Sequence, residues 1–334
     1  MPSGGLRVAL VAHAETWRPY GLTYVGLVGL AAGALASPSP SPWQLLGAWG
    51  VPTLGWLAGL YGGDYFDRKL DAIAKPHRPI PSGRLPARTA LAMMVICCAA
   101  GAVGALLLNW RTLGLVGLAL VAGILYSTWF KARGLSGNLV RGGLTAFAFL
   151  FGTMATATLP PPYLLPVAAL FWLHDASSNL VGTLRDLDGD REGGYGTVPV
   201  RHGVTVALTW AAVLYAAVLA LAAAVPALVP QPRPAGWYWI LLGIAAALGA
   251  SALVSILRAP RPLSPRTALR AHEFFVLERL VLAAALLALG RGAGLALPLL
   301  VAVLVLTWLT QRIMRARYEF AQVAPGGEKE GMNA

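Results

Sequence analysis

The sequence predicts an all-α polytopic membrane protein with nine or ten transmembrane helices, and three observations support this fold class. First, 57% of the 334 residues are hydrophobic and only 12% are charged, whereas a soluble domain carries about 25% charged residues. Second, the mean hydropathy is +0.64. Third, apolar stretches long enough to cross a bilayer recur along the chain. This composition excludes a disordered or collagen-like chain and disfavours a water-soluble globule.

The apolar stretches follow one another without a soluble domain, a linker or a short repeat between them. A helix needs about 20 mostly apolar residues to cross a bilayer, and ten stretches approach that length. We therefore expect residues 1–334 to form a single integral-membrane domain, with residues 325–334 as a loose polar tail. The predicted spans are 19–37, 42–62, 87–108, 112–130, 138–158, 163–184, 204–228, 236–257, 268–290 and 293–314.

The ninth stretch, 268–290, differs from the others because ionisable residues lie in its first half. Glu273, Glu278 and Arg279 are costly inside a bilayer unless they are paired or face a cavity. Part of this stretch can instead lie along the membrane interface. In that case the chain has nine spans rather than ten.

The basic residues predict the orientation of the chain. With a cytoplasmic N-terminus, 22 of the 26 Lys and Arg residues fall in cytoplasmic segments, among them Arg141, Arg185 and Arg315. Such an asymmetry is the positive-inside signal of inner-membrane proteins. It also accounts for the net charge of +12, so we expect no nucleic-acid partner.

Half of the 14 acidic residues gather in two short clusters, each at the cytoplasmic end of an even-numbered span. Asp64, Asp67 and Asp71 are spaced i, i+3 and i+7, and Asp186 and Asp190 are spaced i and i+4, so each set shares one helix face. Like charges stacked in this way destabilise a helix unless they are neutralised. Mg²⁺ prefers oxygen ligands and bridges carboxylates to phosphates. We predict that these five residues are metal ligands, the alternative being two solvated acidic helix ends.

The segment after the first cluster, residues 72–84, holds three prolines and several basic residues. The prolines prevent a long helix there. Lys75 and Arg78 are predicted to bind phosphate, which arginine can hold with two hydrogen bonds. Arg84 and Arg88 are expected to be ordinary cytoplasmic charges, and Arg18 can reach the cavity mouth or mark the membrane interface.

The sixth span carries polar residues below the second acidic cluster. Asp175, Asn179, Gly182 and Asp186 fall on one helix face at 100° per residue. Asp175 lies about 16 Å deeper than Asp186 along the helix axis. An Asp buried in a membrane span suggests a functional site, so Asp175 is a candidate catalytic proton acceptor, with a structural hydrogen bond as the alternative. Asn179 can orient a metal-bound water or a diphosphate.

The two acidic clusters resemble the motifs of the UbiA superfamily of intramembrane prenyltransferases. Asp64, Asp67 and Asp71 match the family's Asn-Asp-x-x-Asp-x-x-x-Asp motif, and Asp186 and Asp190 match its Asp-x-x-x-Asp motif. The resemblance covers most of the chain.

The surroundings of both motifs extend the resemblance. Residues 75–83 and 196–200 are similar to the segments that follow the motifs, and Tyr126 and Lys131 resemble family positions near the diphosphate. One departure is Gly63, which stands where the family usually has Asn.

The resemblance implies a helical bundle around a central cavity whose cytoplasmic mouth binds Mg²⁺ and an isoprenyl diphosphate, here expected to be C10–C20. Asp67 and Asp190 would act in catalysis as metal ligands. The expected partners are this donor, a small-molecule acceptor with an aromatic carbon or a hydroxyl, and membrane lipid. A terpene cyclase on the same scaffold, which needs no acceptor, stays open because of Gly63 and Asp175. A transporter is disfavoured, because the acidic residues cluster at one membrane face.

Overall fold

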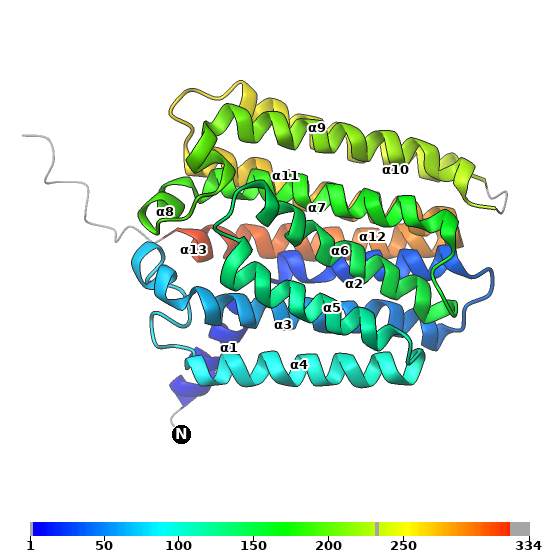
Figure 1. Cartoon of the computed structure of the whole chain (residues 1–334), viewed down its shortest axis with the longest axis horizontal. Helices are drawn as coiled ribbons and strands as arrows, with labels where there is room; N and C mark the ends of the chain where they lie inside the picture. The colour runs from blue at the N-terminus through cyan, green and yellow to red at the C-terminus, as the bar shows by residue number, and fades with distance from the viewer. Residues whose placement is uncertain (1–2, 231–233, 321–334) are drawn as a thin grey trace, which may run out of the picture.

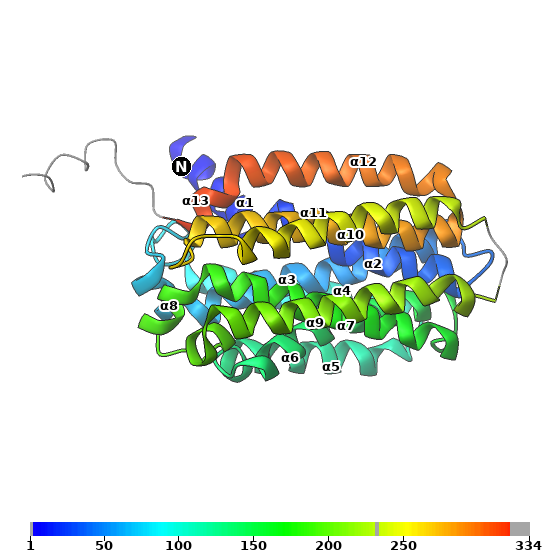
Figure 2. The ribbon, with the colours of Figure 1, turned by 90° about the horizontal axis from the view of Figure 1, so that it is seen from above.

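The computed structural model describes residues 3–230 and 234–320, and this part of the chain is built from α-helices joined by short loops (Figure 1). The predicted polar tail, 325–334, lies outside the described residues. Figures 1 and 2 show that the long helices run side by side along the longest axis of the molecule. The predicted fold class is confirmed.

Each of the ten predicted stretches coincides with one long helix of the described chain. The helices are α2 (Pro19–Ala36), α3 (Pro42–Ala74), α4 (Ala87–Leu108), α5 (Thr112–Leu125), α6 (Leu135–Thr156), α7 (Leu165–Arg185), α9 (Val198–Leu228), α10 (Gly236–Leu257), α11 (Pro265–Arg291) and α12 (Ala293–Thr310).

The shorter elements lie next to these helices. An N-terminal helix that the sequence did not predict precedes α2, and π-helical turns extend α5 and α12. The shorter elements are α1 (Ser3–Trp17), η1 (Tyr126–Phe130), the 3₁₀ turn η2 (Pro162–Leu164), α8 (Leu187–Glu192), η3 (Gln311–Arg315) and α13 (Ala316–Glu319).

Seven of the described helices, two of them together with the turns that extend them, are long and apolar enough to cross a membrane: α2, α4, α5, α6, α9, α10 and α12. The chain is an integral membrane protein. Of the other three long helices, α3 carries the first acidic motif and α11 carries the ionisable residues of the ninth predicted span. Helix α7 ends directly before Asp186, the first residue of the second motif, and Asp190 lies in α8.

Helix α11 packs inside the bundle and does not lie along its surface. Glu278 is 0% exposed and Arg279 is 6% exposed. Glu278 pairs with His174 of α7, and the nearest guanidinium nitrogen of Arg279 lies 3.8 Å from Asp175. Pairing of this kind removes much of the cost of burying a charge. Glu278 and Arg279 thus meet the condition that the sequence sets for ionisable residues within a span, since both are buried against partners of α7.

Close backbone contacts through glycine hold α2 at the centre of the bundle. A Cβ on Gly29 would lie 2.1 Å from the carbonyl oxygen of Ala48 in α3, and a Cβ on Gly152 of α6 would lie 2.1 Å from the carbonyl oxygen of Gly29. Small residues allow such approach between membrane helices, where van der Waals packing replaces the hydrophobic effect as the attraction.

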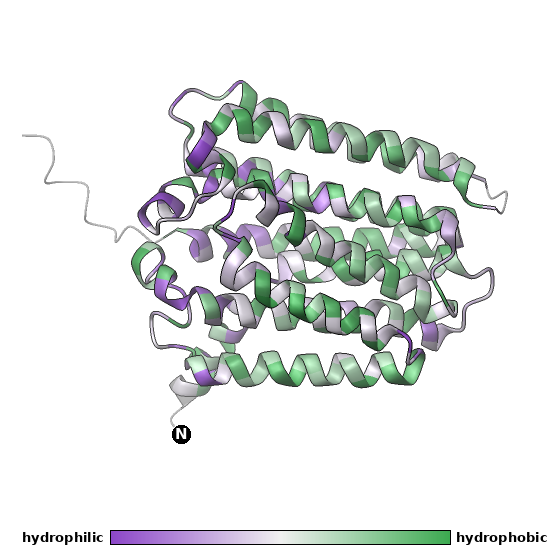
Figure 3. Cartoon of the chain, viewed as in Figure 1, coloured by the Kyte–Doolittle hydropathy of each residue, from purple (hydrophilic) through white to green (hydrophobic). Residues whose placement is uncertain are grey.

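The polar residues gather at one end of the bundle. Figure 3 shows the ribbon coloured as hydrophilic mainly near the end where Figure 1 labels α8 and α13, whereas the middle of the long helices is mostly coloured as hydrophobic. The segments that follow α3, η1, α7, α10 and α12 meet at this end. It is the end that the charge distribution assigns to the cytoplasm.

We predict that Gly152→Val disrupts the contact between α2 and α6, because the added side chain overlaps a backbone oxygen that cannot move away. The substitution should lower the free energy of unfolding by about 1–3 kcal/mol or more, measured by thermal or denaturant unfolding in detergent.

The matched control for this prediction is Gly243→Val, in α10, where an added Cβ meets nothing within 4 Å. Equal unfolding temperatures for the two variants would contradict the packing described for α2.

Candidate active site

A cavity of about 790 Å³ runs from the polar end of the bundle into its interior. Its size lies within the roughly 300–1,000 Å³ typical of small-molecule sites. Residues from α2, α3, α4, α5, α6, α7 and α11 line it, and α8, η3 and α13 contribute to its mouth. The chemistry of the cavity changes with depth, from charged at the mouth to apolar below.

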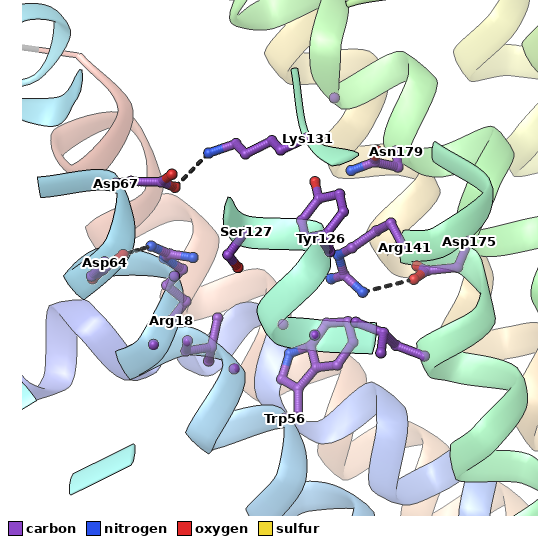
Figure 4. A pocket seen from close by; sticks show the side chains of 18 of the residues that line it. Arg18, Trp56, Asp64, Asp67, Tyr126, Ser127, Lys131, Arg141, Asp175 and Asn179 are labelled. Atoms are coloured by element: carbon purple, nitrogen blue, oxygen red, sulfur yellow. Dashed lines mark hydrogen bonds and ion pairs between the residues drawn. The ribbon is translucent and has the colours of Figure 1, made fainter. Parts of the chain in front are cut away.

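The first acidic cluster lines one wall of the mouth, as its spacing on α3 predicts. Asp64, Asp67 and Asp71 are 4%, 9% and 5% exposed. Each carboxylate is paired with a base from another segment. Arg18 binds Asp64 and Lys131 binds Asp67, as Figure 4 shows.

The third carboxylate, Asp71, accepts two hydrogen bonds of 3.0 Å from Arg78. Three of the predicted binding residues, Arg18, Arg78 and Lys131, are thus brought to the first cluster. Arg18 links α1 to α2 with a φ of 45°, a left-handed conformation that is uncommon outside glycine and is often found at functional sites.

The second cluster faces the first across the mouth. Lys75, which caps the end of α3, lies with its Nζ 2.8 Å from an Asp186 oxygen. A Cβ on Gly189 of α8 would lie 3.3 Å from the Cβ of Ala74. The end of α3 therefore contacts the segment that carries Asp186 and Asp190.

The carboxyl groups of Asp186 and Asp190 differ in pKa. Burial opposes the ionisation of Asp186, but Arg185 and Lys75 outweigh it and hold the pKa of Asp186 well below its usual range. Burial and the negative charge of Asp186 raise the pKa of Asp190 to about 6. Asp190 thus lacks sufficient positive charge around it, which an added cation would supply.

The donor atoms of the first cluster fit a hard divalent cation. Asp64 Oδ2 and Asp67 Oδ1 are buried carboxylate oxygens with no hydrogen-bond partner among the described residues. Unsatisfied carboxylate oxygens are costly to bury, and Mg²⁺ is the kind of ligand that satisfies them. However, no three acidic, His or Cys side chains of residues 3–230 and 234–320 converge on one point. In this part of the chain, Arg18, Arg78 and Lys131 are paired with the three carboxylates of the first cluster.

Glu319, in α13, is a part of the mouth that sequence reasoning missed. Its carboxylate lies 3.0 Å from Lys75, 3.1 Å from Arg78 and 2.8 Å from Arg185. One carboxylate therefore holds three basic groups of the mouth together. No periodic pattern marks Glu319, because its position depends on the turn η3 that returns the chain to the mouth.

The neighbouring residue, Tyr318, completes this part of the mouth. Its hydroxyl donates to Asp64 over 2.9 Å, and its ring lies between the guanidinium groups of Arg18 and Arg78, with 4.5 Å and 4.3 Å from each to the ring centroid. The ring face stabilises both cations by cation–π attraction.

Deeper in the cavity, Asp175 is bound by α6. Its Oδ2 accepts from Arg141 at 3.0 Å and from Thr145 at 2.9 Å. Figure 4 shows Arg141 between Asp175 and the ring of Trp56, whose centroid is 4.1 Å from the guanidinium carbon. The charge pattern counts Arg141 among the cytoplasmic residues, and the structure adds that it lies inside α6 and lines the cavity.

Asn179 and Tyr126 also line the cavity, as predicted. Asn179 accepts a hydrogen bond of 2.7 Å from Asn138 of α6. Tyr126 begins the π-helical turn η1, a kind of distortion that is frequent at functional sites. Figure 4 places Tyr126 between Lys131 and Arg141, in the middle of the polar layer.

Below the polar layer the wall is apolar. Residues of α3, α4, α5 and α6 line it, among them Val51, Gly101, Val116, Phe147 and Phe151. Gly63, the departure from the family motif, also lines the cavity, and a Cβ there would meet nothing within 4 Å. The cavity thus has a charged mouth and an apolar interior.

The profile of the UbiA prenyltransferase family matches residues 23–278. This match spans most of the chain and both acidic motifs. The chain belongs to the UbiA prenyltransferase family.

The relatives of this UbiA-family chain include archaeal enzymes and solved structures. It is 32% identical to a digeranylgeranylglyceryl phosphate synthase of Natronomonas pharaonis, over 70% of this chain and 80% of that protein. A solved digeranylgeranylglyceryl phosphate synthase shares the fold, with a TM-score of 0.64 and 23% identity over 84% of this chain and 98% of that one. A UbiA homologue of Archaeoglobus fulgidus bound to GPP and Mg²⁺ has a TM-score of 0.63 at 17% identity, over 88% and 99% of the two chains.

We predict that Glu319→Gln destabilises this UbiA-family protein, because Lys75, Arg78 and Arg185 lose a shared counter-anion while they stay buried. Removing one partner of a buried ion pair costs about 3–5 kcal/mol. The free energy of unfolding in detergent should fall by that order.

The matched control is Glu192→Gln at the exposed end of α8, which should leave stability unchanged. A Glu319→Gln protein as stable as the control would show that Glu319 does not neutralise the basic groups of the mouth.

Proposed function

We propose that this protein is a Mg²⁺-dependent prenyltransferase that transfers an isoprenyl group from its diphosphate to a hydroxyl of a glyceryl phosphate lipid. The observation that carries the proposal is the mouth of the cavity, where unsatisfied carboxylate oxygens on α3 face basic groups from α7 and the loop after α3. The names of the relatives favour a hydroxyl acceptor over an aromatic one.

The residues of the mouth divide into two groups by chemistry. The carboxylates would hold Mg²⁺, with Asp64 Oδ2 and Asp67 Oδ1 available as oxygen ligands and Asp190 in need of a cation. The full set of proposed ligands is Asp64, Asp67, Asp71, Asp186 and Asp190.

The basic residues of the mouth would bind the diphosphate. Lys75, Arg78 and Arg185 already hold one anion, the carboxylate of Glu319. An incoming diphosphate would replace Glu319 as their counter-anion, since phosphate oxygens make charge-assisted hydrogen bonds to the same groups. Arg18 and Lys131 extend the basic surface toward α3.

The transfer step is a substitution at C1 of the donor. The C1–O bond breaks with its electron pair going to the diphosphate, and the acceptor oxygen forms the new C1–O bond of an ether. Bound Mg²⁺ would stabilise the negative charge of the departing diphosphate. Lys75, Arg78 and Arg185 stabilise the same charge by hydrogen bonding, and the apolar wall below keeps water from the allylic cation.

The acceptor hydroxyl must lose its proton as the ether forms. Asp175 lies on the cavity wall about 16 Å below Asp186 along α7 and has one oxygen, Oδ1, with no closer basic group than Arg279 at 3.8 Å. We assign proton acceptance to Asp175, and orientation of the two substrates to Tyr126 and Asn179.

The proposed function also includes the membrane in which the protein lies and the side that the cavity mouth faces. The whole chain would form one integral-membrane domain of the inner membrane. The mouth and the N-terminus would face the cytoplasm, because the basic loops gather at this end. The isoprenoid chain, C10–C20 in length, would lie against the apolar wall.

Product analysis tests the proposed reaction. The purified protein, Mg²⁺ and geranylgeranyl diphosphate are incubated with and without geranylgeranylglyceryl phosphate, and the products are identified by mass spectrometry. We expect a diprenylated ether only when the acceptor is present. A cyclised hydrocarbon or alcohol formed without acceptor would identify a terpene cyclase instead, and transfer only to aromatic acceptors would contradict the hydroxyl assignment.

We predict that Asp67→Ala or Asp190→Ala lowers kcat by at least ~100-fold, because each removes a proposed metal ligand. Steady-state rates are measured at saturating donor and over a range of Mg²⁺ concentrations.

Asp188→Ala provides the control, since Asp188 belongs to the same sequence cluster but its side chain is 70% exposed. Near-normal turnover in either ligand variant, or an equal loss in the control, would argue strongly against the assigned ligands.

A further inference from the structure

Arg315, in η3, is a buried cation with no carboxylate oxygen within 4.0 Å among residues 3–230 and 234–320. Its residue is 1% exposed and lines the cavity. Its Nη2 donates to Nδ1 of His272, whereas Nε and Nη1 have no hydrogen-bond partner among the described residues. Every other basic residue that lines the cavity has a carboxylate oxygen within 4.0 Å in the described chain.

Other unsatisfied donors line the same cavity, and one of them, Tyr20, lies beside Arg315, whose guanidinium carbon is 5.2 Å from the Tyr20 ring centroid. Arg279 of α11 has an unpartnered Nε, and its nearest carboxylate oxygen lies at 3.8 Å, beyond hydrogen-bond distance. The buried hydroxyls of Tyr20 and Ser178 also lack partners among residues 3–230 and 234–320. All four side chains line the cavity. No side chain or backbone group of the described residues accepts a hydrogen bond from these unpartnered donor atoms.

Glycines leave room beside these donors. A Cβ on Gly182 of α7 would lie 3.5 Å from His272 Nε2, and a Cβ on Gly21 of α2 would lie 3.5 Å from Arg279 Nη2. Larger side chains at these two positions would press against the cations. The space and the donors together form a subsite suited to an anion, because buried guanidinium groups need a charged partner.

This subsite extends from Arg315, at the edge of the mouth, to Arg279, deeper in the cavity. Gly182 is one helical turn deeper on α7 than Asp186, and Asp175, which Arg279 approaches, is about three turns deeper than Asp186. An acceptor must reach C1 of the donor from this deeper side, since the diphosphate occupies the mouth. The position therefore suits the acceptor better than the donor.

We propose that Arg315 and Arg279, with Tyr20 and Ser178, form a second anion subsite that binds the phosphate group of the acceptor. The inference rests on the proposed function and adds the residues that recognise the acceptor. Arginine suits this task, because its planar guanidinium can hold phosphate through two hydrogen bonds.

The test compares Arg315→Gln with the wild type on two acceptors, geranylgeranylglyceryl phosphate and the same lipid without its phosphate. For the phosphorylated acceptor we expect the KM to rise at least ~10-fold, the effect of losing charge-assisted hydrogen bonds, with the donor KM unchanged within about twofold. For the unphosphorylated acceptor we expect no change. Arg315→Lys should recover only part of the loss.

The control variant is Arg312→Gln, on the exposed side of the same turn, which should keep both KM values. A rise in the donor KM for Arg315→Gln would assign Arg315 to the diphosphate site and overturn the inference. An equal loss for both acceptors, or no loss for either, would also overturn it.

A binding measurement separates this inference from the proposed reaction. Glycerol phosphate is titrated calorimetrically into protein whose mouth is filled with Mg²⁺ and an unreactive thiolodiphosphate donor analogue. We expect binding to the wild type and to Arg312→Gln, and at least ~10-fold weaker binding to Arg315→Gln. Binding of this kind, found in a protein that shows no prenyl transfer, would support the subsite while the proposed function fails. Equal binding to all three proteins would overturn the subsite whatever the reaction.

Discussion

The need to neutralise buried charge shapes this protein more than any other constraint. The cavity mouth brings acidic and basic side chains out of water, where an unpaired charge is costly and a paired one is tolerated. Arg18 with Asp64, Lys131 with Asp67, and Arg78 with Asp71 each satisfy that need across two chain segments. The helices that carry these residues are held in register because the pairs must meet.

The need to neutralise buried charge also explains how the site can bind a charged substrate inside an apolar helical bundle. Glu319 supplies an anion where a diphosphate would bind, and unsatisfied carboxylate oxygens on α3 stand where a cation would bind. When substrate and metal bind, the diphosphate would replace Glu319 as the partner of the basic residues, and the metal would bind the unsatisfied carboxylate oxygens. Few additional charges would then be buried. Below this layer, Asp175 and Arg141 form a separate pair, and the apolar wall follows.

The sequence predicts the parts of this structure that depend on one helix at a time. The apolar stretches gave the long helices, and the i, i+3, i+7 spacing placed Asp64, Asp67 and Asp71 on one cavity face. Features that depend on contacts between distant segments were not predictable. The charge pattern counts Arg141 as one more cytoplasmic charge, because its partner Asp175 lies on α7 and the contact exists only in the folded chain. Helix α1 contains too few apolar residues to resemble a span.

The C-terminal part of the mouth shows the same limit more clearly. Tyr318 and Glu319 reach the site only because η3 and α13 follow α12 back to the polar end, and no motif marks them. The predicted metal ligands show the same limit. Spacing shows that carboxylates share a face, but it does not show that basic groups of other helices lie between them.

The most direct test of the charge-exchange account is a structure with Mn²⁺, as a substitute for Mg²⁺, and a thiolodiphosphate donor analogue, with the metal located by anomalous scattering. The account predicts metal bound by oxygens of both acidic clusters and of the diphosphate, with Lys75, Arg78 and Arg185 turned from Glu319 to the diphosphate. Metal bound to one cluster alone, or a diphosphate outside the mouth with Glu319 still in place, would contradict it.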